Sequence, residues 1–162
     1  MTLTTHAIIG GALGAIAFPH NPGVAFAAGF ASHFVMDMIP HWDYHLPSED
    51  KYPDEPLRND MVFRREHILD YLKIALDGAV GIILPLLLFG PFSLAVLFGA
   101  VGGIVPDALQ LAYWKIRREP LTSLQRLHIW FHAKKHYKDR PIIGVPMQVG
   151  IILLVALVVR FI

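Results

Sequence analysis

The sequence predicts an all-α fold: a polytopic membrane helix bundle of about five apolar helices plus one amphipathic interfacial helix. Three observations predict it. Hydrophobic residues make up 54% of the 162 residues and charged residues only 17%, and the mean hydropathy of +0.48 is high for a water-soluble domain. Long apolar stretches are separated by short Pro- and Gly-containing turns, and the last stretch is long enough to span a bilayer. The length favours one domain, residues 1–162.

Two short apolar segments open the chain. Thr4 or Thr5 can cap a first helix that runs to about residue 17, and residues 19–22, with two prolines and an asparagine, then form a turn. A second helix, rich in Gly and Ala, covers about residues 23–39 and ends before a proline. Small residues let helix backbones approach closely, as packed membrane helices do. Because both segments are short for spans, a soluble helical protein with one C-terminal anchor is the alternative.

Two longer apolar helices follow a polar segment. Residues 41–63 are polar and contain prolines, which predicts a loop. A third helix covers about residues 65–89, with a proline that can kink it, and Gly90-Pro91 turns the chain into a fourth helix over about residues 92–114.

The last two elements differ in character. After the basic residues 115–120, apolar side chains recur at helical spacing, which predicts an amphipathic helix to about Tyr137 lying near the membrane interface. These side chains are Leu121, Leu124, Leu127 and Phe131. The nearly uncharged residues 142–162 are long enough to form a C-terminal transmembrane helix.

The distribution of Lys and Arg predicts the topology. The turns at residues 18–22 and 89–92 contain neither, whereas residues 41–66 and 113–141 contain nearly all of them. By the positive-inside rule these two long segments and the N-terminus are cytoplasmic. The first basic residue is Lys51, so the apolar start lacks the basic region of a signal peptide and is expected to remain as structure.

Seven ionisable side chains stand inside or at the edge of apolar segments, where they are expensive unless they face a partner, a cavity or a metal. They are His6, His33, Asp37, Asp77, Asp107, His128 and His132. The depth of the ionisable residues in the first four helices can be counted inward from the two outer turns, at the helical rise of about 1.5 Å per residue. These residues lie at depths of about 16–24 Å, in one slab toward the cytoplasmic side. The sequence therefore predicts that they converge.

These residue types indicate a divalent metal. The chain has nine histidines and no cysteine, so ligands must be nitrogen and oxygen, and Zn²⁺ is the metal that His and Asp suit best. His33 and Asp37 lie one helical turn apart, and His128, His132 and His136 share one helix face. The alternative is structural: a hydrogen-bonded His33–Asp37 pair, with Asp77 and Asp107 capping helices or pairing with nearby Arg or Lys.

Several short motifs resemble the YdjM-like family of bacterial inner-membrane proteins, described as metal-dependent hydrolases. They are Thr5-His6-Ala7 with Gly10 and Gly14, Ser32-His33 with Asp37, Pro40-His41-x-Asp43 and Gly103-x-x-Pro106-Asp107, within about residues 4–136. More distantly, the pattern is similar to zinc-dependent phospholipase C and related zinc nucleases. The resemblance implies a bacterial inner-membrane location and His6, His33, Asp37 and Asp107 as metal ligands. The family's later His-Arg-Gly element is missing, and His128 with His132 can take its place.

The predicted function is therefore hydrolysis of a phosphoester or ester, including lipid substrates, near the cytoplasmic face. His128, His132 and Asp77 are the candidates that complete the site or act in acid–base chemistry. Membrane lipids are the expected partners, and a net charge of +1 gives no reason to expect nucleic acid. The alternative is a non-catalytic membrane scaffold or regulatory protein with a structural metal or a buried His/Asp hydrogen-bond network. Roles for His41, Asp43, Asp70 and His136 are left open.

Overall fold

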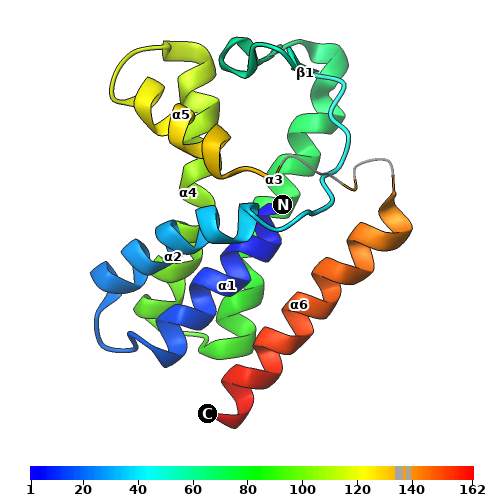
Figure 1. Ribbon diagram of the computed structural model, residues 1–162. Helices are drawn as coiled ribbons and strands as arrows, with labels where there is room; N and C mark the ends of the chain where they lie inside the picture. Colours follow the sequence, from blue (N-terminus) through cyan, green and yellow to red (C-terminus); the bar gives the residue numbers. More distant parts are fainter. Residues whose placement is uncertain (134–136, 138–139) are drawn as a thin grey trace.

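The computed structural model describes residues 1–133, 137 and 140–162, and these residues form six α-helices and one short hairpin (Figure 1). The helices are α1 (Leu3–Ile16), α2 (Pro22–Asp37), α3 (Ile68–Phe89), α4 (Leu94–Ile116), α5 (Leu121–Phe131) and α6 (Pro141–Phe161). The hairpin pairs β1 (Glu49–Asp50) with β2 (Asp60–Met61) in antiparallel register, and two 3-10 turns cover Pro56–Arg58 and Arg65–His67. The prediction of an all-α fold is confirmed.

Three helices are long and apolar enough to cross a membrane: α3 with the turn before it, α4 and α6. The prediction of five apolar helices holds for secondary structure, but α1 and α2 have only 14 and 16 residues. A helix needs about 20 residues to span the hydrocarbon core. Figure 1 shows the α1–α2 turn and the α3–α4 turn at the same end of the molecule, the end opposite the hairpin.

The core of the bundle is a close crossing of three helices. Eight residues of α1 are buried, and this helix packs against α4, α3 and α2. Gly10 of α1 and Gly29 of α2 both lie against the backbone of Gly99 in α4, where an added Cβ would collide with the carbonyl oxygen of Gly99. Glycine at these positions lets the backbones touch, which is how packed helices of small residues associate without a large apolar core.

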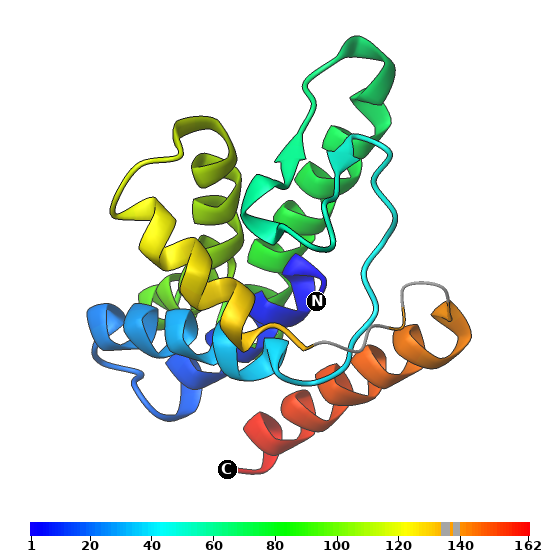
Figure 2. The same ribbon diagram turned by 45° about the horizontal axis from the view of Figure 1, so that its top comes forward.

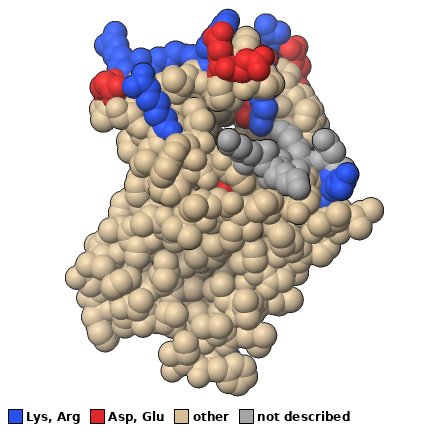
Figure 3. All heavy atoms as spheres, in the orientation of Figure 1, with Lys and Arg blue, Asp and Glu red and all other residues tan. Residues whose placement is uncertain are grey.

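The hairpin closes one end of the molecule over the last turns of α4. Met61 packs against Tyr113 and Trp114, Lys115 Nζ donates to Asp60 Oδ1 at 2.6 Å, and Arg117 donates to backbone carbonyls of residues 57–59. Figure 3 shows charged side chains gathered at this end, while the lower body of the visible face is uncharged. Residues 41–63, predicted to be a loop, thus carry a small ordered hairpin.

Three predicted helix boundaries were wrong. Helix α1 begins at Leu3 because Thr2, not Thr4 or Thr5, is the N-cap and its side chain accepts from the Thr5 N–H. Helix α2 ends at Asp37 rather than residue 39. The amphipathic helix α5 ends at Phe131, because His132 turns into an extended conformation (φ −66°, ψ 128°). His136, predicted to share its face, lies outside the described residues.

Helix α6 lies at the side of the bundle in both ribbon views (Figures 1 and 2). Its main polar attachment is Gln148, whose Oε1 accepts from Thr5 Oγ1 at 3.0 Å and from Thr2 N at 3.2 Å. Gln148 Nε2 donates to the carbonyl oxygen of Trp42 at 2.8 Å. This one amide therefore joins α6 to both α1 and the segment after α2.

Candidate metal centre

Asp37 is the centre of a buried cluster of imidazole nitrogens. Its Oδ1 lies 3.2 Å from His6 Nε2, and its Oδ2 lies 3.1 Å from both His33 Nε2 and His128 Nε2. Two further imidazole nitrogens, His41 Nε2 and His132 Nε2, lie 4.0 Å from one or other oxygen. Five histidines from four separate segments thus surround one carboxylate. Among the described residues, four overlapping groups of three His and Asp side chains have the spacing of metal ligands.

Three ligand atoms lie about as far apart as ligands of one tetrahedral metal. His33 Nε2 and His128 Nε2 are 3.2 Å apart, and each is 3.1 Å from Asp37 Oδ2. Tetrahedral ligands with metal–nitrogen bonds of 2.0–2.1 Å are about 3.3 Å apart. Asp107 Oδ1 lies farther away, 3.7 Å from the first nitrogen and 3.8 Å from the second. His33, His128 and Asp37 can therefore hold one divalent metal, and Asp107 is near enough to the two nitrogens to be a further ligand.

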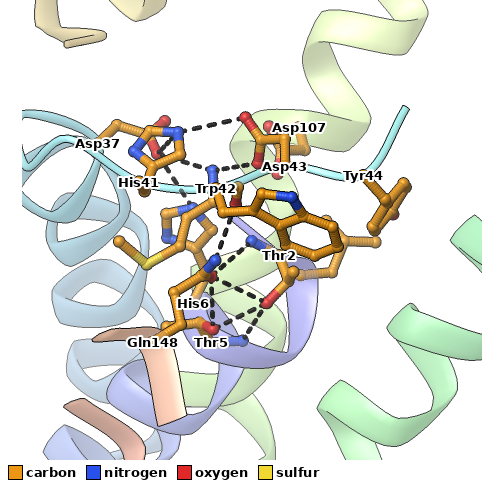
Figure 4. Close-up of polar contacts among 12 residues, drawn as sticks. Thr2, Thr5, His6, Asp37, His41, Trp42, Asp43, Tyr44, Asp107 and Gln148 are labelled. Atoms are coloured by element: carbon orange, nitrogen blue, oxygen red, sulfur yellow. Dashed lines mark hydrogen bonds and ion pairs between the residues drawn. The ribbon is translucent and has the colours of Figure 1, made fainter. Parts of the chain in front are cut away.

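A second ligand group, His41, Asp43 and His132, lies beside Asp37. His41 Nε2 lies 3.3 Å from Asp43 Oδ2. The Met1 amino group lies between Asp37 Oδ1 at 3.4 Å and Asp43 Oδ1 at 2.9 Å. Figure 4 shows His6, His41 and Asp43 converging on Asp37 from α1 and from the segment after α2. His6 and His41 thus lie nearest one oxygen of Asp37, whereas His33, His128 and His132 lie nearest the other.

Two histidines are oriented by backbone carbonyls. His33 Nδ1 lies 2.8 Å from the oxygen of Gly103, and His41 Nδ1 lies 2.7 Å from the oxygen of Ile39. A carbonyl oxygen only accepts, so the hydrogen is assigned to Nδ1 in each ring, and the neutral ring then presents a lone pair at Nε2. Metal-binding histidines usually have this arrangement.

The same assignment turns the lone pair of a neutral His33 ring toward the carboxylate of Asp37. A lone pair on His33 Nε2 facing an ionised Asp37 oxygen at 3.1 Å is repulsive unless a proton or a cation lies between them. His6 is fully buried, and among the described residues neither of its ring nitrogens has a hydrogen-bond partner. Buried polar atoms are normally satisfied, so the donor set fits a divalent cation.

Backbone contacts hold together the five segments that carry the cluster: α1, α2, the segment after α2, α4 and α5 with the residue that follows it. Gly103 of α4 lies so close to α1 that an added Cβ would collide with the carbonyl oxygen of His6. After α5, the Ala133 N–H donates to the carbonyl oxygen of Asp37 at 2.8 Å, and the Tyr137 N–H donates to that of His41 at 2.9 Å. The end of α5 is thereby fixed beside the last turn of α2, which places His128 and His132 against Asp37.

The cluster is buried on one side and open on the other. His6, His33 and Asp37 are no more than 1% exposed, whereas Asp107, His132 and Asp43 have side chains exposed by 28%, 29% and 35%. Among the described residues of the cluster, these three are therefore the solvent-exposed ones, and they form its open side.

Electrostatics keep the open side ready to bind a cation. Burial opposes ionisation of Asp43, but the Met1 amino group and the His41 imidazole outweigh it and hold the pKa of this carboxyl well below its usual range. Burial lowers the pKa of His132 to about 4, against the attraction of Asp37, so this ring is neutral at pH 7. An ionised carboxylate and a neutral imidazole are the forms that ligate metals.

Six of the seven predicted residues come together. His6, His33, Asp37, Asp107, His128 and His132 all belong to the cluster. Asp77 lies outside it, because its carboxylate accepts from the N–H groups of Leu3 and Thr4, the Thr4 hydroxyl and the Tyr44 hydroxyl. It therefore binds the N-terminal end of α1, where the unpaired N–H groups attract a negative charge. Asp70, whose role was left open, binds the Ser48 N–H and Lys73 away from the cluster.

His41 and Asp43 are the residues that sequence reasoning left unassigned and that the structure adds to the cluster. Their position soon after α2, four and six residues beyond the end of a helix that already carries two ligands, was the available signal. Gln148 was missed altogether, although a lone amide in a long apolar helix is itself a signal of a buried polar partner.

No family model matches the chain, and no curated protein or solved structure is significantly similar to it.

Proposed function

We propose that this protein is a membrane-embedded, metal-dependent hydrolase that cleaves a phosphoester or ester bond near the cytoplasmic face of a bacterial inner membrane. The metal is Zn²⁺, and the chain is a member of the YdjM-like family. The three long apolar helices support the membrane location. The basic segments around the hairpin and after α5 support a cytoplasmic N-terminus, by the positive-inside rule.

The observation that carries this proposal is the set of Nε2 atoms around Asp37. Two of these histidines have Nδ1 bound to backbone carbonyls, and imidazole nitrogens lie at each oxygen of the central carboxylate. The ligand atoms are 3.1–3.8 Å apart. Such an arrangement is typical of a preformed metal site. A hydrogen-bond network of neutral rings does not explain the His33 contact, because the Nε2 lone pair of this ring faces an oxygen of Asp37 at 3.1 Å.

The residues divide into three roles. His33, His128, Asp37 and Asp107 would hold a metal, and His41, Asp43 and His132 would form a second ligand group beside the Met1 ammonium. A bound Zn²⁺ would supply a nucleophile from water at neutral pH and would polarise the scissile phosphoryl or carbonyl group. The partly exposed His132 lies at the open side, within reach of a leaving group, and is the candidate acid–base residue.

A second candidate function has one specific observation in its favour. The histidines nearest Asp37 are almost completely buried, and a structural metal site is closed, with four protein ligands and no open position. A scaffold protein with a structural metal would show this burial. The partial exposure of Asp107, His132 and Asp43 favours the hydrolase.

Metal-dependent hydrolysis by purified protein tests the proposal. Detergent-purified protein is stripped of metal, reloaded with Zn²⁺, Mn²⁺ or Mg²⁺, and assayed on water-soluble aryl phosphate and carboxylate esters. We expect activity that chelation abolishes, that a metal restores, and that His128→Gln reduces at least 100-fold. The exposed Asp54→Asn is the matched control and keeps full activity. A protein that binds metal tightly but hydrolyses none of these esters, nor any phospholipid in micelles, would establish the scaffold function instead.

A further inference from the structure

We propose that a groove on the membrane-facing side of α3 binds the acyl chain of a phospholipid whose phosphate group faces the open side of the metal centre. The inference rests on the proposed function and names its substrate class: an intact membrane phospholipid that enters sideways from the bilayer.

The groove lies between the beginning of α1, the middle of α3 and Tyr44. Its volume is about 330 Å³, and its accessible surface is almost entirely apolar. This volume falls at the low end of the range of about 300–1,000 Å³ typical of small-molecule sites. The lining residues are Thr2, Thr4, Tyr44, Lys73, Leu76, Asp77 and Val80.

The apolar wall of the groove is part of a lipid-facing helix surface. Leu76 is 67% exposed and Val80 is 39% exposed, in the middle of a helix long and apolar enough to span a membrane. Leu72, Ile83 and Leu87 continue this exposed apolar surface along the same helix. The groove therefore opens toward hydrocarbon, and an acyl chain is the abundant molecule that can enter it there.

One end of the groove is apolar and the other is charged, as are the two ends of a phospholipid. Val80 lies toward the middle of α3, whereas Lys73 lies two turns nearer the charged end of the molecule. The Lys73 ammonium is half-exposed and pairs with Asp70 at 3.1 Å, so it can also attract a phosphate at the groove's polar end. The carboxylate of Asp77 does not oppose an anion strongly, because N–H groups of α1 and two hydroxyls bind it.

The groove lies next to the metal centre. Tyr44 follows Asp43 in the chain, and Thr2 follows Met1, whose amino group contacts both Asp37 and Asp43. Figure 4 shows Tyr44, Asp43 and Asp107 on the same side of the cluster. A phosphate at the polar end of the groove therefore reaches the exposed side of the ligand set.

Lipid binding by metal-free protein tests the inference without hydrolysis of the ligand. Binding of a long-chain phosphatidylglycerol and of its short-chain, micelle-free analogue is measured by native mass spectrometry and by titration in detergent. The groove is filled in Leu76→Trp/Val80→Trp, and Leu87→Trp places the same bulk on the same exposed helix outside the groove. We expect wild type and Leu87→Trp to bind the long-chain lipid at least 10-fold more tightly than the short-chain analogue, and the groove-filled variant to lose this preference.

Two results would overturn the inference. One is a folded groove-filled variant that binds the long-chain lipid as wild type does, and the other is equal wild-type affinity for the two chain lengths, which indicates recognition of the headgroup alone. Far-ultraviolet circular dichroism and metal content verify folding, and Leu76→Phe replaces the double variant if that variant does not fold.

Failure of this inference can be distinguished from failure of the proposed function. If the hydrolase proposal alone is wrong, chain-dependent lipid binding remains but no ester is hydrolysed. If the groove inference alone is wrong, wild type still hydrolyses a water-soluble phosphate ester, but one of the two overturning lipid-binding results is obtained.

Discussion

At the scale of single residues, Asp37 is a buried carboxylate surrounded by imidazole rings. It is 1% exposed, and three imidazole nitrogens lie within 3.2 Å of its two oxygens. Two of the surrounding histidines, His33 and His41, are held by carbonyls that accept their Nδ1 hydrogens. The sequence shows the i,i+4 spacing of His33 and Asp37. The contacts of Asp37 with His6 and His128 depend on helix packing, and the sequence predicted only that such residues lie in one region of the bundle.

The ion pair between Asp60 and Lys115 gives a pH-dependent prediction away from the metal centre. Partial burial opposes ionisation of Asp60, but the Lys115 hydrogen bond, the Met61 N–H and the charge of Arg117 lower its pKa. The pair therefore stabilises the hairpin above the ordinary Asp pKa of about 3.9, and the contribution is lost as the pH falls through the lowered value.

Asp60→Asn should weaken the hairpin at pH 7 by about 0.2–1 kcal/mol, as expected for a half-exposed pair. Hydrogen exchange of residues 49–61 measures the effect. The difference in hairpin stability between Asp60→Asn and wild type should persist down to about pH 4 and shrink at lower pH. The exposed Asp54→Asn is the control, and an Asp60→Asn effect that grows as the pH falls would contradict the assignment.

At the scale of elements, the bundle depends on how closely α1, α2 and α4 cross. The glycine content of these helices indicated close packing, and Gly10, Gly29 and Gly99 are the positions where the backbones touch. Which glycine faces which helix could not be predicted, because a helix of mostly small and apolar residues has no strong polar side to orient it.

Gly99→Ala should destabilise the protein by about 1–3 kcal/mol, because the added methyl group collides with the carbonyl oxygen of Gly10. Gly150→Ala in α6 is the matched control, since no atom lies within 4 Å of the added Cβ. Thermal unfolding in detergent should show a lower Tm for the first variant only. Equal Tm values for the two variants would show that the three helices do not cross as described.

The amide of Gln148 gives a second prediction at this scale. Gln148→Leu removes the hydrogen bonds to Thr2, Thr5 and the Trp42 carbonyl, and Trp42 lies between His41 and Asp43. We expect metal affinity to fall about 10–100-fold, as for other residues that orient ligands. Competition with a metal-binding dye measures this affinity, and Val149→Ala, at the next and exposed position, should leave it unchanged. Unaltered affinity in Gln148→Leu would mean that α6 does not position the site.

At the scale of the whole molecule, charge and apolar surface are segregated. Of the 14 Lys and Arg residues, all but Arg160 lie in residues 51–140, and Figure 3 shows charged side chains at the hairpin end. The α1–α2 and α3–α4 turns lie together at the opposite end. The order of turns and basic segments could be predicted, because the charge of a loop is given by its sequence. The hairpin could not be predicted, because it depends on contacts with α4.

The absence of cysteine from the chain allows a direct test of topology. Single cysteines at Asn21 and Phe92 should react with a membrane-impermeant maleimide in spheroplasts, because both turns face outward in the proposed topology. A cysteine at Asp54 should react only after the membrane is permeabilised. Labelling of all three positions from the same side would refute the alternating arrangement and the depth of the metal centre.

The central claim is that the cluster around Asp37 binds a divalent metal, and metal stoichiometry tests it most directly. Detergent-purified protein equilibrated with Zn²⁺ and then desalted should retain one to two metal ions per chain by plasma mass spectrometry. His33→Ala and Asp107→Ala should each retain less than half of the wild-type content, and Asp54→Asn should retain all of it. Wild-type protein without stoichiometric metal, or both ligand variants with unchanged content, would contradict the account.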